Sequence, residues 1–365
     1  MGTDGYSQAR CFFVSTFLPT AAALFLLCLV LPPAAKAQAQ LRVVATLPDF
    51  ASIARSVGGE LVEVTSLLRG GEDPHFVEPR PSFVKELAQA DALALAGMDL
   101  ELGYLPPLLQ GARNSKILPG ATGYVDCSRV ITPLEVPTGS VDRSMGDVHP
   151  WGNPHYWLDP LNGRRIAALL AEVFSTLRPE HRTRFVANAD AFQREIAAKL
   201  VGKELAETYD VEKLALLYER GGLEEFLRGR GELGKFSGWL AELAAYRGFK
   251  AVDDHNMWPY FARRFGFEIV GHMEPKPGIA PTTAHLRQLV ERMRADGVRV
   301  ILSSPYYDPK HARFLAEATG ARIVPLAHIT GSRPGTDDYL ATIDYNVRQL
   351  RLALQAISPA PEAKP

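Results

Sequence analysis

Residues 41–59 read LRVVATLPDFASIARSVGG, and this stretch decides the class of fold. It begins with an apolar, β-branched run and continues with apolar residues at helical spacing that end at Gly58 and Gly59. This pattern predicts a strand, a loop and a helix. Similar strands alternate with amphipathic helices along the chain, which predicts mostly parallel sheets covered by helices on both faces.

The expected elements fall into two halves. In the first half, we expect strands at 61–68 and near 92–96, with shorter strand pieces at 115–120 and 123–130. Residues 162–209 have helical periodicity and predict two helices, the second unusually long. The second half alternates strand and helix again, so we predict two α/β lobes joined by one long, rigid helix.

The predicted organisation has five parts. They are a signal peptide at 1–39, an N-terminal lobe at 40–178, a linking helix at 179–210, a C-terminal lobe at 211–357 and a disordered tail at 358–365.

The composition excludes some classes of partner. The 365 residues include 40 Lys and Arg against 41 Asp and Glu, which gives a formal net charge of -1. A chain this close to neutral has no electrostatic reason to bind nucleic acid or an anionic membrane surface. The length favours two domains, and the 47% of hydrophobic residues is ordinary for a globular protein with a sizeable core.

The first 39 residues have the order of a secretory signal peptide: a polar start, an apolar run and small residues near Ala37. An uncleaved membrane anchor is the alternative, although Pro19 interrupts the apolar run. Cleavage after Ala37 or Ala39 would leave Cys127 as the one remaining cysteine, so no internal disulfide would form. A large exported chain without disulfides suggests a bacterial periplasm.

Three of the nine histidines lie in loops that suit a binding site. His75 lies in GGEDPHFVEPRP after an expected strand, His155 lies in NPHYWLDP, and His255 ends the strand-and-loop AVDDH. Ligands bind at the carboxyl ends of parallel strands, and the prolines beside His75 and His155 stiffen the backbone. Three neutral imidazoles from separate loops are a credible ligand set for zinc, manganese, iron or copper, although a surface turn would also explain His75.

The remaining histidines carry less weight. His149 lies six residues before His155 and either contacts a metal as an auxiliary ligand or caps a turn. His181, His285 and His311 lie among charged or polar residues of expected helices, so we expect them on solvated faces.

Acidic and aromatic residues adjoin the candidate ligands. We expect four carboxylates to orient the imidazoles by accepting their second N–H group: Asp73, Asp159, Asp253 and Asp254. Asp159 has an equally good alternative role as a helix cap. Trp157 and Trp258 are expected to pack and exclude water.

These motifs together resemble the metal-binding receptors of bacterial ABC uptake systems for zinc and manganese, the periplasmic family (cluster A-I, or cluster 9) that includes the zinc-uptake and treponemal metal receptors. The matching stretches are DPHFVEPRPS (73–82), NPHYWLDPLN (153–162), HNMWPYFARRFGF (255–267), EPKPGIAPTTAHL (274–286) and DYLATIDYN (338–346). The resemblance extends over residues 41–357. Each motif alone is weak, but their order and spacing make the set specific.

The resemblance implies one metal ion in a cleft between two α/β lobes. By position it implies His75, His155 and His255 as ligands. The family often has an aspartate after the last strand, where this chain has Ala327, so His328, Glu274 or a water molecule is the candidate fourth ligand. Many relatives also have a histidine-rich loop before the second ligand, and here that stretch contains only His149.

The expected function is that of a monomeric periplasmic receptor, not an enzyme, that captures a divalent transition metal and delivers it to an inner-membrane ABC permease. Zinc is favoured because an all-nitrogen site suits it, and a carboxylate from Glu274 would favour Mn²⁺ or Fe²⁺. A secreted zinc-dependent hydrolase with a three-histidine site is the alternative, but no H-E-x-x-H glutamate is present as a general base. A surface adhesin is a third class, and its typical lipid-anchoring cysteine is absent.

Overall fold

The computed structural model describes residues 8, 10–12, 40–139, 149–276 and 278–357. Apart from residues 8 and 10–12, the predicted signal peptide lies outside the described residues, and so does the predicted tail at 358–365. The chain divides into two compact units, Met1–Ala39 and Gln40–Pro365, and every element named below belongs to the second. Within the described ranges, no helix has the length and apolar character needed to cross a membrane.

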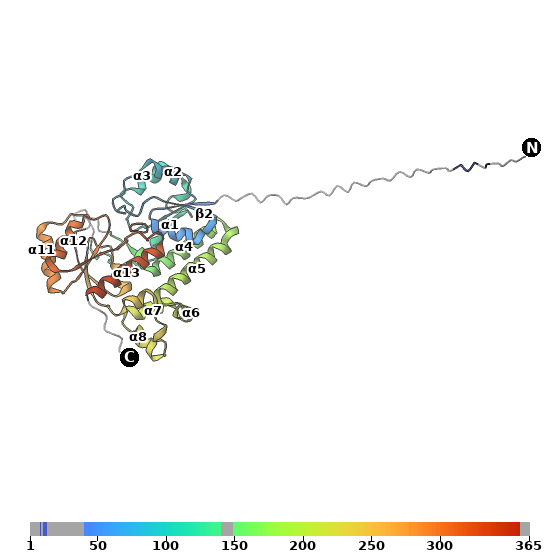
Figure 1. Ribbon diagram of the computed structural model, residues 1–365. Helices are drawn as coiled ribbons and strands as arrows, with labels where there is room; N and C mark the ends of the chain where they lie inside the picture. Colours follow the sequence, from blue (N-terminus) through green and yellow to red (C-terminus); the bar gives the residue numbers. More distant parts are fainter. Residues whose placement is uncertain (1–7, 9, 13–39, 140–148, 277, 358–365) are drawn as a thin grey trace, which may run out of the picture. The chain divides into compact units, whose positions relative to one another are not determined.

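The first sheet is parallel and four-stranded, with the order β2-β1-β3-β4. Its strands are β1 (Leu41–Ala45), β2 (Val62–Ser66), β3 (Ala92–Leu95) and β4 (Tyr124–Asp126). The intervening helices are α1 (Pro48–Gly58), α2 (Pro81–Gln89) and α3 (Leu105–Ala112), as Figure 1 shows in blue and cyan. The central strands β1 and β3 are almost entirely buried because helices cover the sheet, which explains their apolar sequences.

The second sheet repeats this arrangement with the order β6-β5-β7-β8, again all parallel. Its strands are β5 (Lys250–Asp253), β6 (Glu268–His272), β7 (Val300–Ser303) and β8 (Arg322–Pro325). The helices of this half are α10 (Pro259–Phe265), α11 (Thr283–Ala295), α12 (Pro309–Thr319) and α13 (Tyr339–Ile357). In each sheet the first strand of the half lies between the second and the third, and ligands bind at the carboxyl ends where the order reverses.

A helical segment connects the two halves. Its helices are α4 (Pro160–Leu177), α5 (Arg182–Val201), α6 (Lys203–Thr208), α7 (Val211–Glu219), α8 (Leu223–Gly229) and α9 (Gly238–Ala244). The 20-residue helix α5 packs against α1 of the first half and against α4, α7 and α9. Its Lys199 side chain also forms an ion pair with Asp344 of α13 at 2.7 Å, so α5 contacts elements of both halves. Figure 1 shows α4 and α5 beside each other. The predicted fold of two parallel α/β lobes with a long connecting helix is confirmed.

The predicted linking segment, 179–210, is divided into shorter pieces. Pro179–His181 forms a 3-10 turn before α5, and α5 ends at Val201. Gly202 ends the helix because its φ of 95° lies in a region that L side chains rarely adopt. A Cβ atom there would also lie only 2.3 Å from Oγ of Ser237 and 2.9 Å from the carbonyl oxygen of Lys235. The helical periodicity continues into α6, which explains the prediction of one longer helix.

The predicted strand piece at 115–120 is wrong. Ser115–Ile117 is a 3-10 turn, and the Asn114 side chain caps it by accepting a hydrogen bond from the Lys116 backbone N–H at 3.1 Å. Within the predicted piece at 123–130, Tyr124–Asp126 forms β4 and the rest turns. The apolar residues of both pieces suggested strands, whereas side-chain caps formed turns.

A buried ion pair fixes the start of α4. Asp159 is the N-cap of this helix and accepts a hydrogen bond from the Leu161 backbone N–H at 3.0 Å. Its two carboxylate oxygens each accept a 2.8 Å hydrogen bond from the guanidinium of Arg264 in α10. Arg264 is 6% exposed, and its third guanidinium nitrogen, Nη1, lies 2.8 Å from Glu219 Oε1. Asp159 therefore acts as a helix cap and as a link to the second half of the chain.

We expect Arg264→Met to lower the free energy of unfolding by about 3–5 kcal/mol, because it leaves the buried carboxylate of Asp159 without its cation. The neighbouring Arg263→Met is a matched control, since Arg263 forms an ion pair with the same Glu219 through a half-exposed side chain. The control should change the free energy of unfolding by less than about 1 kcal/mol. Urea denaturation of both variants measures the difference, and equal losses would contradict this account.

Candidate metal centre

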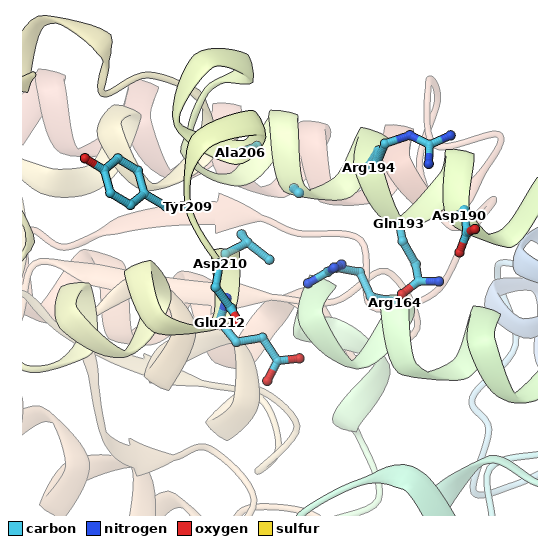
Figure 2. Close-up of a pocket in the computed structure, with 10 residues that line it drawn as sticks. Arg164, Asp190, Gln193, Arg194, Ala206, Tyr209, Asp210 and Glu212 are labelled. Atoms are coloured by element: carbon cyan, nitrogen blue, oxygen red, sulfur yellow. The ribbon is translucent and has the colours of Figure 1, made fainter.

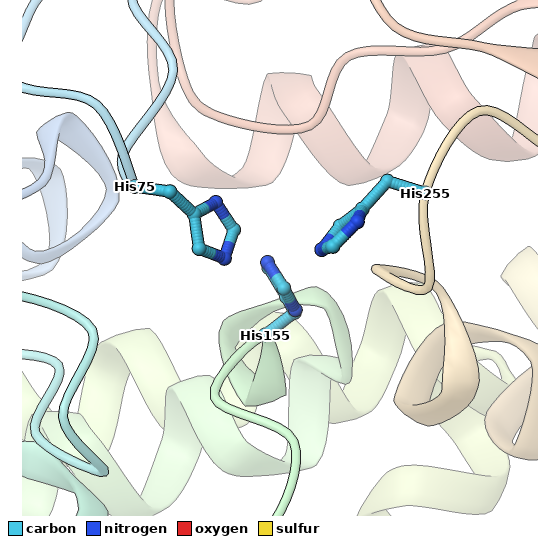
Figure 3. Close-up of side chains that lie close together, drawn as sticks. All are labelled: His75, His155 and His255. Atoms are coloured by element: carbon cyan, nitrogen blue, oxygen red, sulfur yellow. The ribbon is translucent and has the colours of Figure 1, made fainter. Parts of the chain in front are cut away.

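Three histidines from distant parts of the chain meet at one point. His75 lies between β2 and α2, His155 lies just before α4, and His255 follows β5. One ring nitrogen from each lies within 4.8 Å of the other two, and Figure 3 shows the three rings turned toward a common centre. In the part of the chain that the structure describes, no other group of histidine, cysteine or acidic side chains converges in this way.

Each of the three rings is held by its Nδ1 atom. The contacts are 3.0 Å from His75 to Asp73 Oδ1, 2.9 Å from His155 to Asn153 Oδ1 and 2.9 Å from His255 to Glu274 Oε2. A neutral ring that donates Nδ1–H to these oxygens keeps a lone pair on Nε2. The Nε2 atoms of His75 and His155 are buried, and neither has a hydrogen-bond partner among the described residues.

The same local turn positions two of these rings. The Asp73 and Asn153 side chains each lie two residues before a histidine, in D-P-H and N-P-H. In both cases one side-chain oxygen accepts a hydrogen bond from the backbone N–H of the histidine at 3.0 Å and also contacts its ring. The prediction for Asp73 is therefore confirmed. Asn153 was missed, although the shared pattern was a signal in the sequence.

The other predicted acidic partners lie elsewhere. Asp253 contacts Nδ1 of His272 at 2.6 Å, and Asp254 accepts a hydrogen bond from the Ser304 backbone N–H at 2.7 Å. Neither carboxylate has a hydrogen bond to the three converging rings in the described structure. Glu274, which the sequence offered as a candidate ligand, accepts hydrogen bonds from the ring of His255 and from the Gly278 backbone N–H.

His328 joins the cluster from the loop after β8. Its side chain is fully buried, and its ring centroid lies 4.9 Å from that of His155. Its Nδ1 is hydrogen-bonded to the Tyr306 hydroxyl, and its Nε2 is buried with no hydrogen-bond partner in the described residues. Ala327, where the resemblance leads one to expect an acidic residue, exchanges two backbone hydrogen bonds with the Asn346 side chain.

His149 lies at another side of the cluster. Its half-buried ring has its centroid 5.6 Å from that of His75. A hydrogen bond with the Met98 backbone engages the ring, and Nε2 has no hydrogen-bond partner in the described residues. Residues 140–148, immediately before it, lie outside the described residues. Five of the nine histidines of the chain therefore gather in one place.

The two tryptophans predicted to pack near the site do so, whereas the three helical histidines are less exposed than predicted. The rings of Trp157 and Trp258 are fully buried, and Trp157 Nε1 donates a 3.0 Å hydrogen bond to the His328 carbonyl, so packing roles are confirmed. Of the helical histidines, His285 is half-buried, and its Nε2 contacts the His272 carbonyl at 2.9 Å. His181 and His311 are also half-buried rather than fully solvated.

Burial keeps several rings of the cluster uncharged. Removal from water, followed by repulsion from the other imidazoles, lowers the pKa of His155 well below its ordinary value of 6.5. The same causes lower the pKa values of His149 and His328 to about 3. These rings are therefore neutral at pH 7, and a metal ion does not have to displace protons from them.

These pKa values predict that the metal-free protein loses stability in acid. Below pH 6.5 the unfolded chain protonates His149 and His328, while the folded protein does not protonate them until the pH approaches about 3. The unfolded state then binds more protons, so the free energy of unfolding falls as the pH is lowered from 6.5 toward 3. Urea denaturation of the chelator-treated protein at several pH values tests this.

The matched variant for this experiment is His328→Gln. It removes one titrating group and should flatten the decline by up to about 1.4 kcal/mol per pH unit. A free energy of unfolding that stayed constant between neutral pH and pH 5 would contradict the burial of neutral rings.

A separate pocket has a lining of different chemistry from that of the histidine cluster. A pocket of about 420 Å³ lies between α4, α5 and the link from α6 to α7. Figure 2 shows guanidinium, amide and carboxylate groups among its lining side chains, including Arg164, Gln193 and Asp190, together with the phenol of Tyr209. Asp210 caps α7, and Glu212 is paired with Arg165 at 2.6 Å. The described residues that line this pocket include no histidine or cysteine, so its donors do not suit a transition metal.

Comparison with known proteins matches most of the chain to one family. Residues 43–209 and 230–353 match the family model described as "Zinc-uptake complex component A periplasmic". This match confirms the resemblance that the sequence motifs indicated.

Individual relatives are distant in sequence. The "High-affinity zinc uptake system protein ZnuA" of Brucella abortus (strain 2308) is 25% identical over 168 residues, which cover 46% of this chain but only 40% of that protein. The protein of the same name from Paracoccus denitrificans (strain Pd 1222) is 24% identical over 334 residues, covering 82% of this chain and 87% of that one.

Solved structures share the fold. A crystal structure of ZnuA has a TM-score of 0.62 at 22% identity and covers 86% of this chain and 99% of its own. A Mn-bound periplasmic metal binding protein from Candidatus Liberibacter asiaticus has a TM-score of 0.61 at 18% identity and covers 86% of this chain and all of its own. At these identities the likeness shows the two-lobed fold alone.

Proposed function

Because the chain belongs to the family described as zinc-uptake complex component A, periplasmic, we propose that it captures a divalent transition metal ion and delivers it to an ABC permease in the inner membrane. The observation that carries this proposal is the convergence of three imidazole nitrogens within 4.8 Å of one another. Several distant relatives are named as zinc-uptake or metal-transport binding proteins, which supports the same reading. The metal ion is the cargo of such a receptor.

The proposed ligands are the Nε2 atoms of His75, His155 and His255, with His328 as the fourth. Zinc sites are usually four-coordinate, and the His328 ring is the nearest to His155, with an unpartnered Nε2 in the described structure. Glu274 has a supporting role in this arrangement, because its carboxylate holds the His255 ring. His149 would contact the ion only as an auxiliary ligand at the side of His75.

Zinc is the proposed cargo. Four imidazole nitrogens suit Zn²⁺ well, whereas Mn²⁺ prefers more oxygen ligands and Fe²⁺ binds nitrogen sites more weakly than Zn²⁺. The rings of His155 and His328 are neutral at pH 7, so their lone pairs are available without loss of a proton.

A hydrolase is not favoured at this site. The carboxylates nearest to the rings belong to Asp73 and Glu274, and both already accept hydrogen bonds from proposed ligands. Both are therefore engaged in orienting a ligand ring, which is a supporting role rather than that of a general base for a metal-bound water.

The sequence and the family also suggest an oligomeric state, a location and domain boundaries for the protein. We propose a monomer in the periplasm, exported by a signal peptide at 1–39. The proposed lobes are residues 40–178 and 211–357, joined through 179–210, and the ion lies between them.

We expect His75→Ala, His155→Ala and His255→Ala each to weaken zinc binding by more than the roughly 10- to 100-fold that loss of a supporting group costs. His311→Ala is the matched control, since this histidine lies on α12, outside the cluster. Competitive titration with a chromophoric zinc chelator measures the affinities, and elemental analysis of the purified protein identifies the metal. If the three variants bound zinc as tightly as the parent, the proposed function would fail.

Glu274 offers a test of its supporting role. Glu274→Gln keeps an oxygen that accepts the Nδ1–H of His255, so zinc affinity should change by only a few-fold, roughly. Glu274→Ala removes that acceptor and should weaken binding by roughly 10- to 100-fold. The same titration distinguishes them, and an equally large loss in both variants would indicate that the carboxylate itself binds the ion.

A further inference from the structure

The Tyr306 hydroxyl is hydrogen-bonded to the ring of His328. We propose that Tyr306 is a positioning residue, which holds His328 in the tautomer whose Nε2 can bind metal and so sets the preference of the site for zinc. This inference rests on the proposed function and adds a residue that neither the sequence motifs nor the family match indicated.

Tyr306 belongs to the loop between β7 and α12. This loop lies next to the one that carries His328, because β7 and β8 are paired strands. Its ring centroid lies 5.9 Å from that of His328, at an interplanar angle of 66°. The hydroxyl therefore meets the edge of the imidazole at Nδ1, on the side away from the free Nε2. A third group, Sδ of Met257, lies 3.9 Å from the same hydroxyl.

Counting protons assigns the direction of the hydrogen bond. If the hydroxyl donated to Nδ1, the single ring proton would sit on Nε2, which is buried without an acceptor in the described structure. That arrangement leaves a buried donor unpaired and blocks metal binding. If Nδ1–H donates to the hydroxyl oxygen, the phenolic proton can point to the Met257 sulfur, a weak acceptor. The Nε2 lone pair then faces the cluster.

The tautomers of the three neighbouring rings are fixed by partners that can only accept a hydrogen bond. The Nδ1 atoms of His75, His155 and His255 contact oxygens of Asp73, Asn153 and Glu274. Carboxylate and amide oxygens only accept, so those tautomers are fixed. A hydroxyl accepts or donates, which makes His328 the ring whose tautomer depends on a further contact.

The position of His328 affects the selectivity of the site for a metal as well as its affinity. With His328 as a ligand the site has four nitrogens, and without it three nitrogens and solvent remain. Loss of a nitrogen ligand weakens Zn²⁺ binding more than Mn²⁺ binding, because Mn²⁺ depends less on nitrogen ligands. Tyr306 would therefore control how strongly the protein prefers zinc to manganese.

The test is Tyr306→Phe, which keeps the ring and removes the hydroxyl. We expect zinc affinity to fall roughly 10- to 100-fold, as for other groups that support a metal ligand. Manganese affinity should fall less, so the ratio of the two affinities should decrease. The visible absorption of the Co²⁺-loaded protein should also change, since Co²⁺ reports the number and type of its ligands. Tyr307→Phe, the adjacent position, is the matched control and should leave all three measurements unchanged.

A double-mutant cycle separates positioning from a general loss of structure. In the background of His328→Ala, Tyr306→Phe should cause no further loss of zinc affinity, because the ring it positions is gone. An equal further loss would overturn the inference, and so would parental zinc affinity and Co²⁺ absorption in the single variant. Urea denaturation of each variant shows whether it is folded.

The results also separate this inference from the proposed function. If His75→Ala, His155→Ala and His255→Ala abolish zinc binding while Tyr306→Phe does not affect it, the positioning role alone is overturned. If those three variants retain zinc binding, the proposed function falls and the inference with it.

Discussion

The structure depends on keeping several buried imidazole rings uncharged in one place. Each ring that took a proton would be a cation out of water beside others of the same sign, which is why burial lowers the pKa values so far. The fold fixes the orientation of four rings by giving Nδ1 of each an oxygen partner, from Asp73, Asn153, Glu274 and Tyr306. What remains is a set of nitrogen lone pairs facing one another, an arrangement that a metal cation would stabilise.

Much of the fold and part of the site could be predicted from the sequence, because those signals are local. The alternation of strand and helix follows from apolar spacing, and His75, His155 and His255 stand out because of their loops. Predictions failed where a single residue overrode the pattern. Gly202 ends a helix whose periodicity continues, and the Asn114 side chain turns an apolar stretch that looked like a strand.

The side chains that hold the rings also differ in how far they lie from their histidines along the chain. Asn153 lies two residues from His155, so its role was readable in the sequence. Glu274 lies 19 residues from His255, and Tyr306 lies 22 residues from His328. Both contacts depend on the pairing of β5 with β6 and of β7 with β8, which brings the loops after neighbouring strands together. No periodicity in the sequence indicates which loop residues then meet.

The segments that carry the converging rings are far apart in the chain. His75 follows a strand of the first sheet, and His328 follows the last strand of the second, more than 250 residues later. Cys127 is a free, buried thiol. An ion bound by these rings would link the two halves of the chain reversibly, and it would stabilise the folded state for as long as it stays bound. Binding of the ion would then make the protein more rigid. Release of the ion would require ligands from both halves to dissociate from it.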